Sequence, residues 1–108
     1  MKVAVFGSRG VTVPDLEKYL PLETSEIILG GANGINASAI KYALANDKIL
    51  TEFRPEKRKY SRTAPFRRYI KIIRYADLVL TFWDGNSLGT RFVIEKCNRL
   101  RVPIHVFV

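Results

Sequence analysis

Strand-like and helix-like segments alternate along this chain, and that alternation constrains the fold more than any other feature of the sequence. The strand-like segments are short runs rich in β-branched and aromatic residues. Five of them are predicted strands, namely Lys2–Phe6, Glu26–Leu29, Lys48–Phe53, Asp77–Phe82 and Pro103–Val108. Because strands that alternate with helices pair in parallel, the pattern predicts a three-layer, Rossmann-like α/β domain with a five-stranded parallel sheet in the order 3-2-1-4-5. The 108 residues, 47% of them hydrophobic, are enough for one such domain over residues 1–108.

The segments between the predicted strands carry signals for helices. Pro14 suits a first helical turn, where Asp15 and Glu17 complement the positive end of the helix dipole. Asn36 is expected to be the N-cap of the second helix, and Pro65 opens the third. The side chains expected in the core are Ala37, Ile40 and Leu44 from the second helix, Phe66, Ile70 and Ile73 from the third, and Val93, Cys97 and Leu100 from the fourth.

The cysteine content and the apolar segments bear on the compartment. The single thiol, Cys97, cannot form an intrachain disulfide or a metal cluster of the usual Cys/His type, so a reducing cytoplasm fits best and no metal site is expected. The first residues run into a strand pattern without the long apolar segment of a signal peptide, and no apolar stretch approaches the roughly 18 residues of a membrane span. We therefore expect a soluble cytoplasmic protein without a membrane partner.

The positive charge is concentrated in one segment. The net charge is +8, and residues 54–74 contain nine basic residues against one acid, Glu56. Such a segment can attract nucleic acid, an anionic ligand or an acidic partner, or it can be a solvated face. Its irregular part, residues 54–63, can be an ordered loop or a lid that closes on a ligand. The residues that would contact a nucleic acid are Arg58, Lys59, Arg62, Arg67, Arg68, Lys71 and Arg74, with Tyr60 or Tyr69 stacking on bases.

All seven glycines fall in three loops, each between the carboxyl end of a predicted strand and a helix. They are Gly7 and Gly10 after strand one, Gly30, Gly31 and Gly34 after strand two, and Gly85 and Gly89 after strand four. Glycine at such a position permits positive φ and close approach of the backbone to a ligand, although tight turning alone is the alternative interpretation. In the predicted strand order these three loops meet beside strand one, where parallel sheets commonly bind ligands. The loops therefore predict a site for a nucleotide-like ligand that carries phosphate.

Polar and aromatic residues in the same loops suit such a ligand. Arg9 can add a charge-assisted hydrogen bond to phosphate, and the pair Trp83-Asp84 suits a base and a ribose hydroxyl. Alternatively, Trp83 is a core residue and Asp84 forms a turn with Gly85. Ser87 and Thr90 offer hydroxyls at the same mouth, or they simply cap a helix. The predicted ligand-binding residues are Gly7, Ser8, Arg9, Gly30, Gly31, Ala32, Asn33, Gly34, Trp83, Asp84, Gly85, Ser87, Gly89 and Thr90.

Three motifs together resemble the YspA-like branch of the SLOG superfamily. They are Gly7-Ser8-Arg9-Gly10, Gly30-Gly31-Ala32-Asn33-Gly34 and Phe82-Trp83-Asp84-Gly85-Asn86-Ser87-Leu88-Gly89-Thr90, and the likeness covers nearly the whole chain. The resemblance implies a Rossmann-like fold and recognition of nucleotides or nucleotide-derived ligands, with self-association common and no further cofactor required. Relatives include phosphoribohydrolases, DprA-type proteins that bind single-stranded DNA, and domains thought to sense nucleotide signals in bacterial and phage conflict.

The chain departs from the family pattern where the chemistry of cleavage would need it. Family members usually carry an aspartate where this chain has Asn36 and an asparagine where it has Tyr69. The phosphoribohydrolase signature has glutamates within three residues of its Gly-Thr, whereas the first acid after Thr90 is Glu95, five residues on. The remaining candidates for acid–base catalysis are Asp84 and Glu52. The sequence thus favours a ligand-binding domain, with a nucleotide-cleaving enzyme and a nucleic-acid-binding protein as alternatives.

Overall fold

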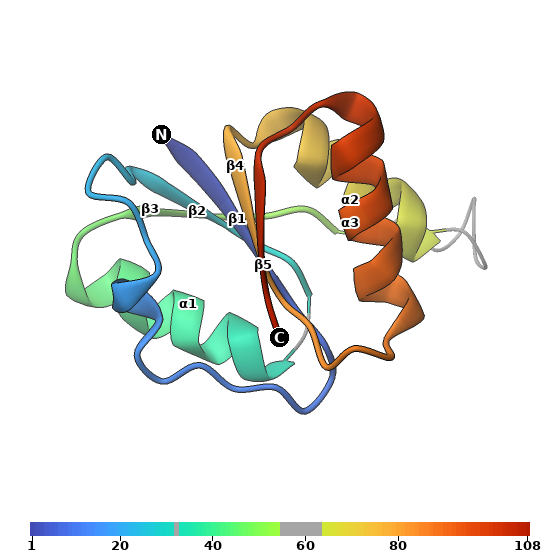
Figure 1. Cartoon of the computed structure of the whole chain (residues 1–108). Coiled ribbons are helices and arrows are strands. Elements are labelled where there is room, and N and C mark those ends of the chain that lie inside the picture. Colours follow the sequence, from blue (N-terminus) through green and yellow to red (C-terminus); the bar gives the residue numbers. More distant parts are fainter. Residues whose placement is uncertain (32, 55–63) are drawn as a thin grey trace.

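The computed structural model of the chain describes residues 1–31, 33–54 and 64–108, and it shows a parallel sheet between two layers of helix (Figure 1). The elements are β1 (Lys2–Gly7), η1 (Leu16–Lys18), β2 (Glu26–Leu29), α1 (Asn33–Ala45), β3 (Ile49–Glu52), α2 (Ala64–Tyr75), β4 (Leu78–Phe82), α3 (Leu88–Leu100) and β5 (Ile104–Phe107). All neighbouring strands are parallel, and their order is β3-β2-β1-β4-β5. The predicted fold class and strand order are therefore confirmed.

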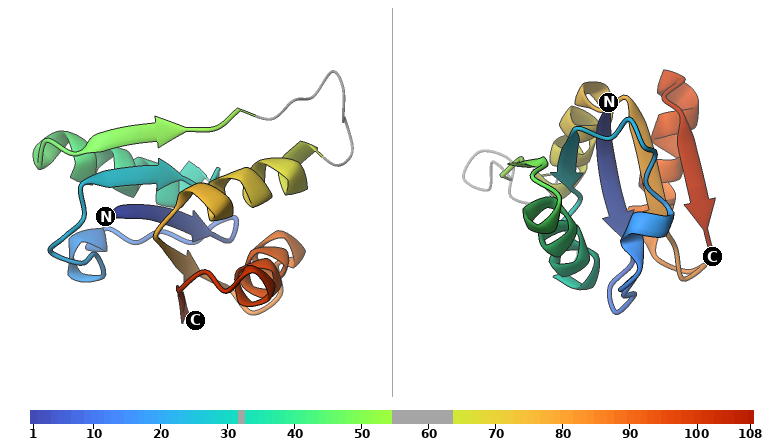
Figure 2. Two further views of the ribbon diagram at one scale, coloured as in Figure 1. Left: turned by 90° about the horizontal axis from the view of Figure 1, so that it is seen from above. Right: turned by 90° about the vertical axis from the view of Figure 1, so that its left-hand side faces the viewer.

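The helices cover opposite faces of the sheet, as the two turned views in Figure 2 show. Side chains alternate between the faces of a strand, so the fully buried Val3 and Val5 of β1 point to α1 and η1, whereas Ala4 and Phe6 point to α2 and α3. Cys97 of α3 lies in the second of these cores, as expected, and burial raises the pKa of its thiol to about 11. Among the described residues, none of the helices has both the length and the apolar character that crossing a bilayer requires.

Three sequence predictions about the first helical layer are wrong. The segment at Pro14 forms only the short 3-10 helix η1, whose Leu16 is buried against the sheet. Helix α1 begins at Asn33, so Asn36 lies within it and is not its N-cap. The buried stripe of α1 is Ile35, Ala39 and Ala43, while the expected Ala37, Ile40 and Leu44 are exposed, Leu44 by 74%. Small alanine side chains let this helix lie close to the sheet, and that leaves the larger side chains on its flank.

The other helices follow the prediction more closely. In α2 the fully buried side chains are Ile72 and Ile73, whereas Phe66 is 39% exposed. Its ring packs edge-on against Phe92 of α3, with 4.8 Å between ring centroids, so Phe66 joins the two helices near the surface rather than filling the core. Leu100 is partly buried against the same core.

Candidate functional site

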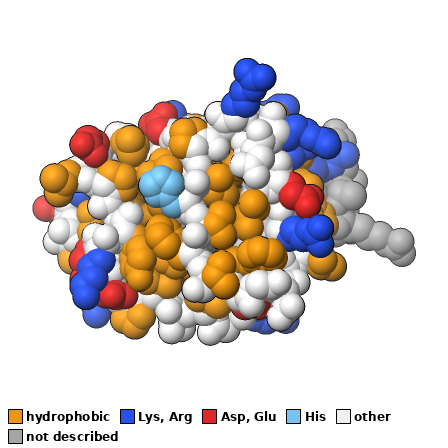
Figure 3. Space-filling view, viewed as in Figure 1, with side chains coloured by type: hydrophobic (Ala, Val, Ile, Leu, Met, Phe, Trp, Pro, Cys, Tyr) orange, Lys and Arg blue, Asp and Glu red, His pale blue; other side chains and the backbone are white. Residues whose placement is uncertain are grey.

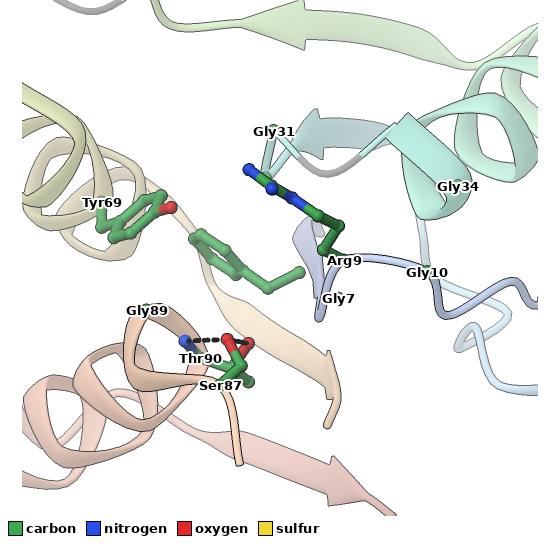
Figure 4. Close-up of a pocket in the computed structure, with 11 residues that line it drawn as sticks. Gly7, Arg9, Gly10, Gly31, Gly34, Tyr69, Ser87, Gly89 and Thr90 are labelled. Atoms are coloured by element: carbon green, nitrogen blue, oxygen red, sulfur yellow. Dashed lines mark hydrogen bonds between the residues drawn. The ribbon is translucent and has the colours of Figure 1, made fainter. Parts of the chain in front are cut away.

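A cavity of about 430 Å³ opens at the carboxyl ends of β1 and β2, beside the first turns of α1 and α3 (Figure 4). Its volume lies in the range of sites for small organic ligands. The residues that line it are Phe6, Gly7, Arg9, Gly10, Gly30, Gly31, Gly34, Tyr69, Ser87, Gly89 and Thr90. Six of the seven glycines are in this set, so the structure brings the three predicted glycine segments together at one place. Not all of them lie in loops as predicted, because Gly7 ends β1 and Gly34 and Gly89 lie in the first turns of α1 and α3.

Packing accounts for some of these glycines. A Cβ atom on Gly30 would collide with the carbonyl oxygen of Val5, and one on Gly34 would lie 2.5 Å from the carbonyl oxygen of Val11. At both places a side chain would press into the backbone of a neighbouring segment. These two residues therefore have a structural reason to be glycine, whatever the cavity holds.

No steric clash of this kind explains the glycine at position 89. Its φ is not in the left-handed region, and a Cβ there would meet nothing closer than the hydroxyl oxygen of Tyr69, at 3.7 Å. Gly89 also lies in the first turn of α3, where glycine is a poorer helix former than alanine by about 1 kcal/mol. The structure therefore gives Gly89 free space on the side of the cavity that it shares with Tyr69.

Ser8 joins the first and third glycine loops. Its hydroxyl oxygen lies 3.1 Å from that of Thr90 and accepts a hydrogen bond of 3.1 Å from the backbone N–H of Asp84. Ser87 caps α3 by accepting from the backbone N–H of Thr90, so its predicted capping role is confirmed, and it also lines the cavity. Ser8 is only 1% exposed, so its hydroxyl holds the two loops in place from beneath the cavity floor.

Trp83, Asp84 and Gly85 lie in the same loop as Ser87 but do not line the cavity. The indole N–H of Trp83 donates to the carbonyl oxygen of Ser87, and Asp84 Oδ1 accepts from the backbone N–H groups of Asn86 and Ser87. These two backbone donors hold the pKa of Asp84 below its ordinary value. Asp84 thus forms the turn that is the alternative interpretation of the sequence, and the contacts of Trp83 and Asp84 with a base and a ribose remain predictions.

An aromatic wall faces the glycine loops, and it is formed by Phe6 and Tyr69. Their rings meet edge-on with 5.5 Å between centroids. Sequence reasoning missed Phe6 as a lining residue and assigned Tyr69 only to nucleic acid. A signal was present for Phe6, because it is the last large side chain before the first glycine loop.

Arg68 is the second residue that sequence reasoning placed elsewhere. Together with Arg67 and Lys71 it was assigned to the basic segment, yet it lies one helical turn before the fully buried Ile72 and so points toward the sheet. Its Nη2 donates a hydrogen bond of 3.0 Å to the carbonyl oxygen of Gly30, and a Cβ on Gly31 would collide with the same guanidinium group. Arg68 therefore lies against the second glycine loop.

Asn36 also acts on this loop. Its side-chain Oδ1 accepts a hydrogen bond of 3.2 Å from the backbone N–H of Gly31. The residue that departs from the family pattern thus folds the glycine loop back onto α1. One consequence is that the N–H of Gly31 already has a partner within the protein.

The remaining predicted residues lie away from the cavity or outside the described part of the chain. Glu52 is exposed on the edge strand β3, 3.9 Å from Arg54, and Glu95 pairs with Arg91 on the surface of α3 at 3.1 Å. Arg67, Lys71 and Arg74 are exposed on α2. Outside the described residues are Ala32, Arg58, Lys59, Tyr60 and Arg62, as well as the side chain of Asn33.

Neither the structure nor known proteins supply a ligand for the site. Within residues 1–31, 33–54 and 64–108, no three His, Cys, Asp or Glu side chains gather in a way that could hold a metal ion. Comparisons with protein-family models, with curated proteins and with solved structures gave no match for this chain. The case for a function therefore rests on the residues of the cavity.

Proposed function

We propose that the cavity binds a nucleotide or a nucleotide-derived molecule that carries phosphate. The observation that supports this most is the convergence of six glycines and Arg9 on one cavity at the carboxyl ends of parallel strands. That is the place where open α/β sheets bind ligands. The resemblance of the glycine motifs to the SLOG superfamily leads to the same proposal.

The glycine side of the cavity suits the phosphate. The first turns of α1 and α3 both border it, and a helix N-terminus favours an anion by about 0.3–1 kcal/mol. Binding in the micromolar range requires about 8 kcal/mol, so helix ends alone are not enough. A charge-assisted hydrogen bond from Arg9 would add about 1.5–3 kcal/mol. We therefore place the phosphate between the glycine loops and Arg9.

The opposite side suits the base. Tyr69 offers aromatic surface there and is backed edge-on by Phe6, which is only 4% exposed, and Gly89 leaves room beside the Tyr69 hydroxyl. Stacking of a base on an aromatic side chain contributes about 1–3 kcal/mol. In this arrangement Tyr69 takes the place beside the base that the sequence assigned to Trp83.

Binding is a better proposal than cleavage. General acid–base chemistry needs a carboxylate or a histidine at the reacting centre. Of the described residues that line the cavity, none is a carboxylate or a histidine. Asp84 already uses one oxygen in its turn, and Glu52 is on the far edge strand.

A panel of ligands tests the proposal. Thermal unfolding of the full chain would be measured with nucleoside mono- and diphosphates, NAD and ADP-ribose at millimolar concentration, for the natural sequence and for Arg9→Ala. We expect at least one nucleotide to raise the melting temperature of the natural sequence, and Arg9→Ala to reduce that shift. The absence of a shift for every compound would overturn the proposal.

A second candidate function rests on charge. Helices α2 and α3 form one layer, and together they carry seven basic residues against one acid, Glu95. In Figure 3 the blue Lys and Arg side chains gather over this layer on the right, whereas the surface around the His105 side chain on β5 is mainly hydrophobic and uncharged. A positively charged face of this kind suits the phosphates of a nucleic acid. The same charge also favours the approach of any anionic ligand to the cavity.

A further inference from the structure

The guanidinium group of Arg68 is partly buried and has no carboxylate beside it among the described residues. Its Nε atom is buried without a hydrogen-bond partner among the described residues. The group donates to the carbonyl oxygen of Gly30 and lies 5.2 Å from the centre of the Tyr69 ring. A buried donor without a partner is rare in folded proteins, and a charged one is costly. Arg68 is not itself among the residues that line the cavity, but its guanidinium group lies against Gly31, which does line it.

Arg9 approaches the same loop from the other side. Figure 4 shows its side chain extending from the first glycine loop toward Gly31, and both residues line the cavity. Arg68 lies against Gly31 from α2, because a Cβ at Gly31 would collide with its guanidinium group. In the described part of the chain, neither Arg9 nor Arg68 has a carboxylate within the 4.0 Å of an ion pair. Arg9 and Arg68 thus place two like charges beside one loop, and neither has an ion-pair partner in the part of the chain that the structure describes.

The loop amide at this point is not free to serve an anion instead. The N–H of Gly31 donates to Asn36 Oδ1. Among the described residues, the charged donors beside Gly31 are the two guanidinium groups, whose planar fork of N–H donors matches phosphate oxygens in pairs.

We propose that Arg9 and Arg68 clamp a dianionic phosphate group beside Gly31, so that the cavity selects phosphate monoesters and diphosphates over nucleosides and phosphodiesters. This inference rests on the proposed function and names the class of ligand. Two positive charges at one point are best neutralised by a group with two negative charges. A nucleoside brings none, and a phosphodiester brings one.

The competing explanation is that Arg68 only braces the backbone at Gly30. In that case its replacement would lower stability but would weaken all ligands alike. The clamp predicts instead that the loss is confined to ligands with a dianionic phosphate. The quantity to compare is thus the loss of affinity for ligands with a dianionic phosphate against the loss for ligands without one. A purely structural role of Arg68 would make the two losses equal.

The test is isothermal titration calorimetry on the full chain with four probes: pyrophosphate, adenosine 5′-monophosphate, 3′,5′-cyclic adenosine monophosphate and adenosine. The variants are Arg68→Met and, as the matched control, Arg74→Met, which removes the same charge from an exposed position of the same helix. We expect Arg68→Met to weaken pyrophosphate and the monophosphate at least about tenfold, and Arg74→Met to weaken them less than about twofold. Arg68→Lys keeps the charge but loses the fork, and it should fall between the natural protein and Arg68→Met.

The outcomes separate this inference from the proposed function. Equal losses in Arg68→Met and Arg74→Met, or no loss in either, would overturn the clamp. Should Arg68→Met fail to fold, Arg68→Lys and Arg9→Met carry the comparison, and unchanged pyrophosphate affinity in both would overturn it as well. Binding of pyrophosphate that depends on Arg68, without binding of any nucleotide, would support the clamp and contradict the nucleotide proposal. Nucleotide binding that is unchanged in Arg68→Met would support the nucleotide proposal and contradict the clamp.

Discussion

The hydroxyl oxygens of Ser8 and Thr90 lie 3.1 Å apart, although 82 positions separate the two residues in the sequence. Ser8 follows β1 and Thr90 lies in the first turn of α3, so this contact joins two of the three loops around the cavity. The backbone N–H of Asp84 donates to the same Ser8 oxygen. One small buried side chain thus ties together two of the segments that surround the cavity.

Replacing this serine tests that link. Ser8→Ala leaves the N–H of Asp84 without its partner and removes one of the two hydroxyl partners of Thr90, the other being Ser87, and we expect the free energy of unfolding to fall by about 1–3 kcal/mol. Urea titration measures it. Ser25→Ala is the control, because Ser25 is exposed at the opposite end of the sheet and, among the described residues, its hydroxyl group bonds to Met1 alone. A loss in Ser8→Ala no larger than in Ser25→Ala would contradict this account.

Substitution of Gly89 should affect the stability of the fold and the affinity for a nucleotide in different ways. Gly89→Ala should leave the protein as stable or raise the free energy of unfolding by up to about 1 kcal/mol, because alanine favours the helix and its Cβ has room. The same methyl group projects toward Tyr69 at the cavity, so we expect weaker nucleotide binding. Chemical denaturation and calorimetry measure the two effects.

Gly85 provides the matched control for that substitution. It lies in the same loop with a φ of 88° and outside the cavity lining. Gly85→Ala should therefore destabilise the protein by about 1–2 kcal/mol without a specific loss of affinity. A variant Gly89→Ala that binds nucleotides like the natural chain would show that the ligand does not approach α3.

The lowered pKa of Asp84 predicts how the stability of the fold depends on pH. Its pKa is lowered in the folded protein by the N–H groups of Asn86 and Ser87. A carboxylate with a lowered pKa stabilises the fold above the pKa of the unfolded chain, about 3.9, and this contribution is lost as the pH falls through the folded value. In Asp84→Asn the contribution is absent at every pH.

The stability difference between the two proteins should therefore shrink from about pH 4 downward. Urea unfolding of the natural chain and of Asp84→Asn at several pH values checks this. A difference that stays constant down to pH 2 would mean that the carboxylate of Asp84 is not held by its turn.

The charged layer of α2 and α3 predicts a salt dependence. If a nucleic acid binds there and about six of its phosphates are neutralised, the logarithm of the association constant should fall with the logarithm of salt concentration at a slope near −4 to −5. Fluorescence anisotropy with a labelled single-stranded oligonucleotide measures the slope. A flat response would eliminate nucleic acid as the partner of this layer.

The fold and the position of the cavity can be predicted from the sequence, because both depend on patterns that recur along the chain. Five β-rich runs separated by helix-length segments define the parallel order, and glycines at strand ends mark where the cavity lies. The buried stripe of α1 was missed because Ala39 and Ala43 are weak apolar signals beside Ile40 and Leu44. Nothing local shows that a close helix–sheet contact selects the smaller side chains.

The wall residues of the site are harder to read, because they depend on contacts between distant segments. Arg68 is one basic residue among several in the sequence, and only the packing of α2 turns it toward Gly30. Asp84 lies in a loop where the sequence predicts ligand-binding residues. Its carboxylate nevertheless accepts hydrogen bonds from the backbone N–H groups two and three residues further on. Whether such a side chain bonds to nearby backbone groups or to a ligand decides its role, and the residue type alone does not reveal which.

The most direct test of the proposed site follows the backbone amides of the glycines during a titration. Two-dimensional ¹H–¹⁵N spectra of the full chain would be recorded with increasing adenosine 5′-monophosphate, guanosine 5′-monophosphate or ADP-ribose. We expect the signals of Gly10, Gly31 and Gly89 to shift with one common affinity for at least one compound, and that of Gly85 to stay in place. Glycine signals that do not move with any of them, or shifts that are as large at Gly85 as at the other three, would contradict a nucleotide site in this cavity.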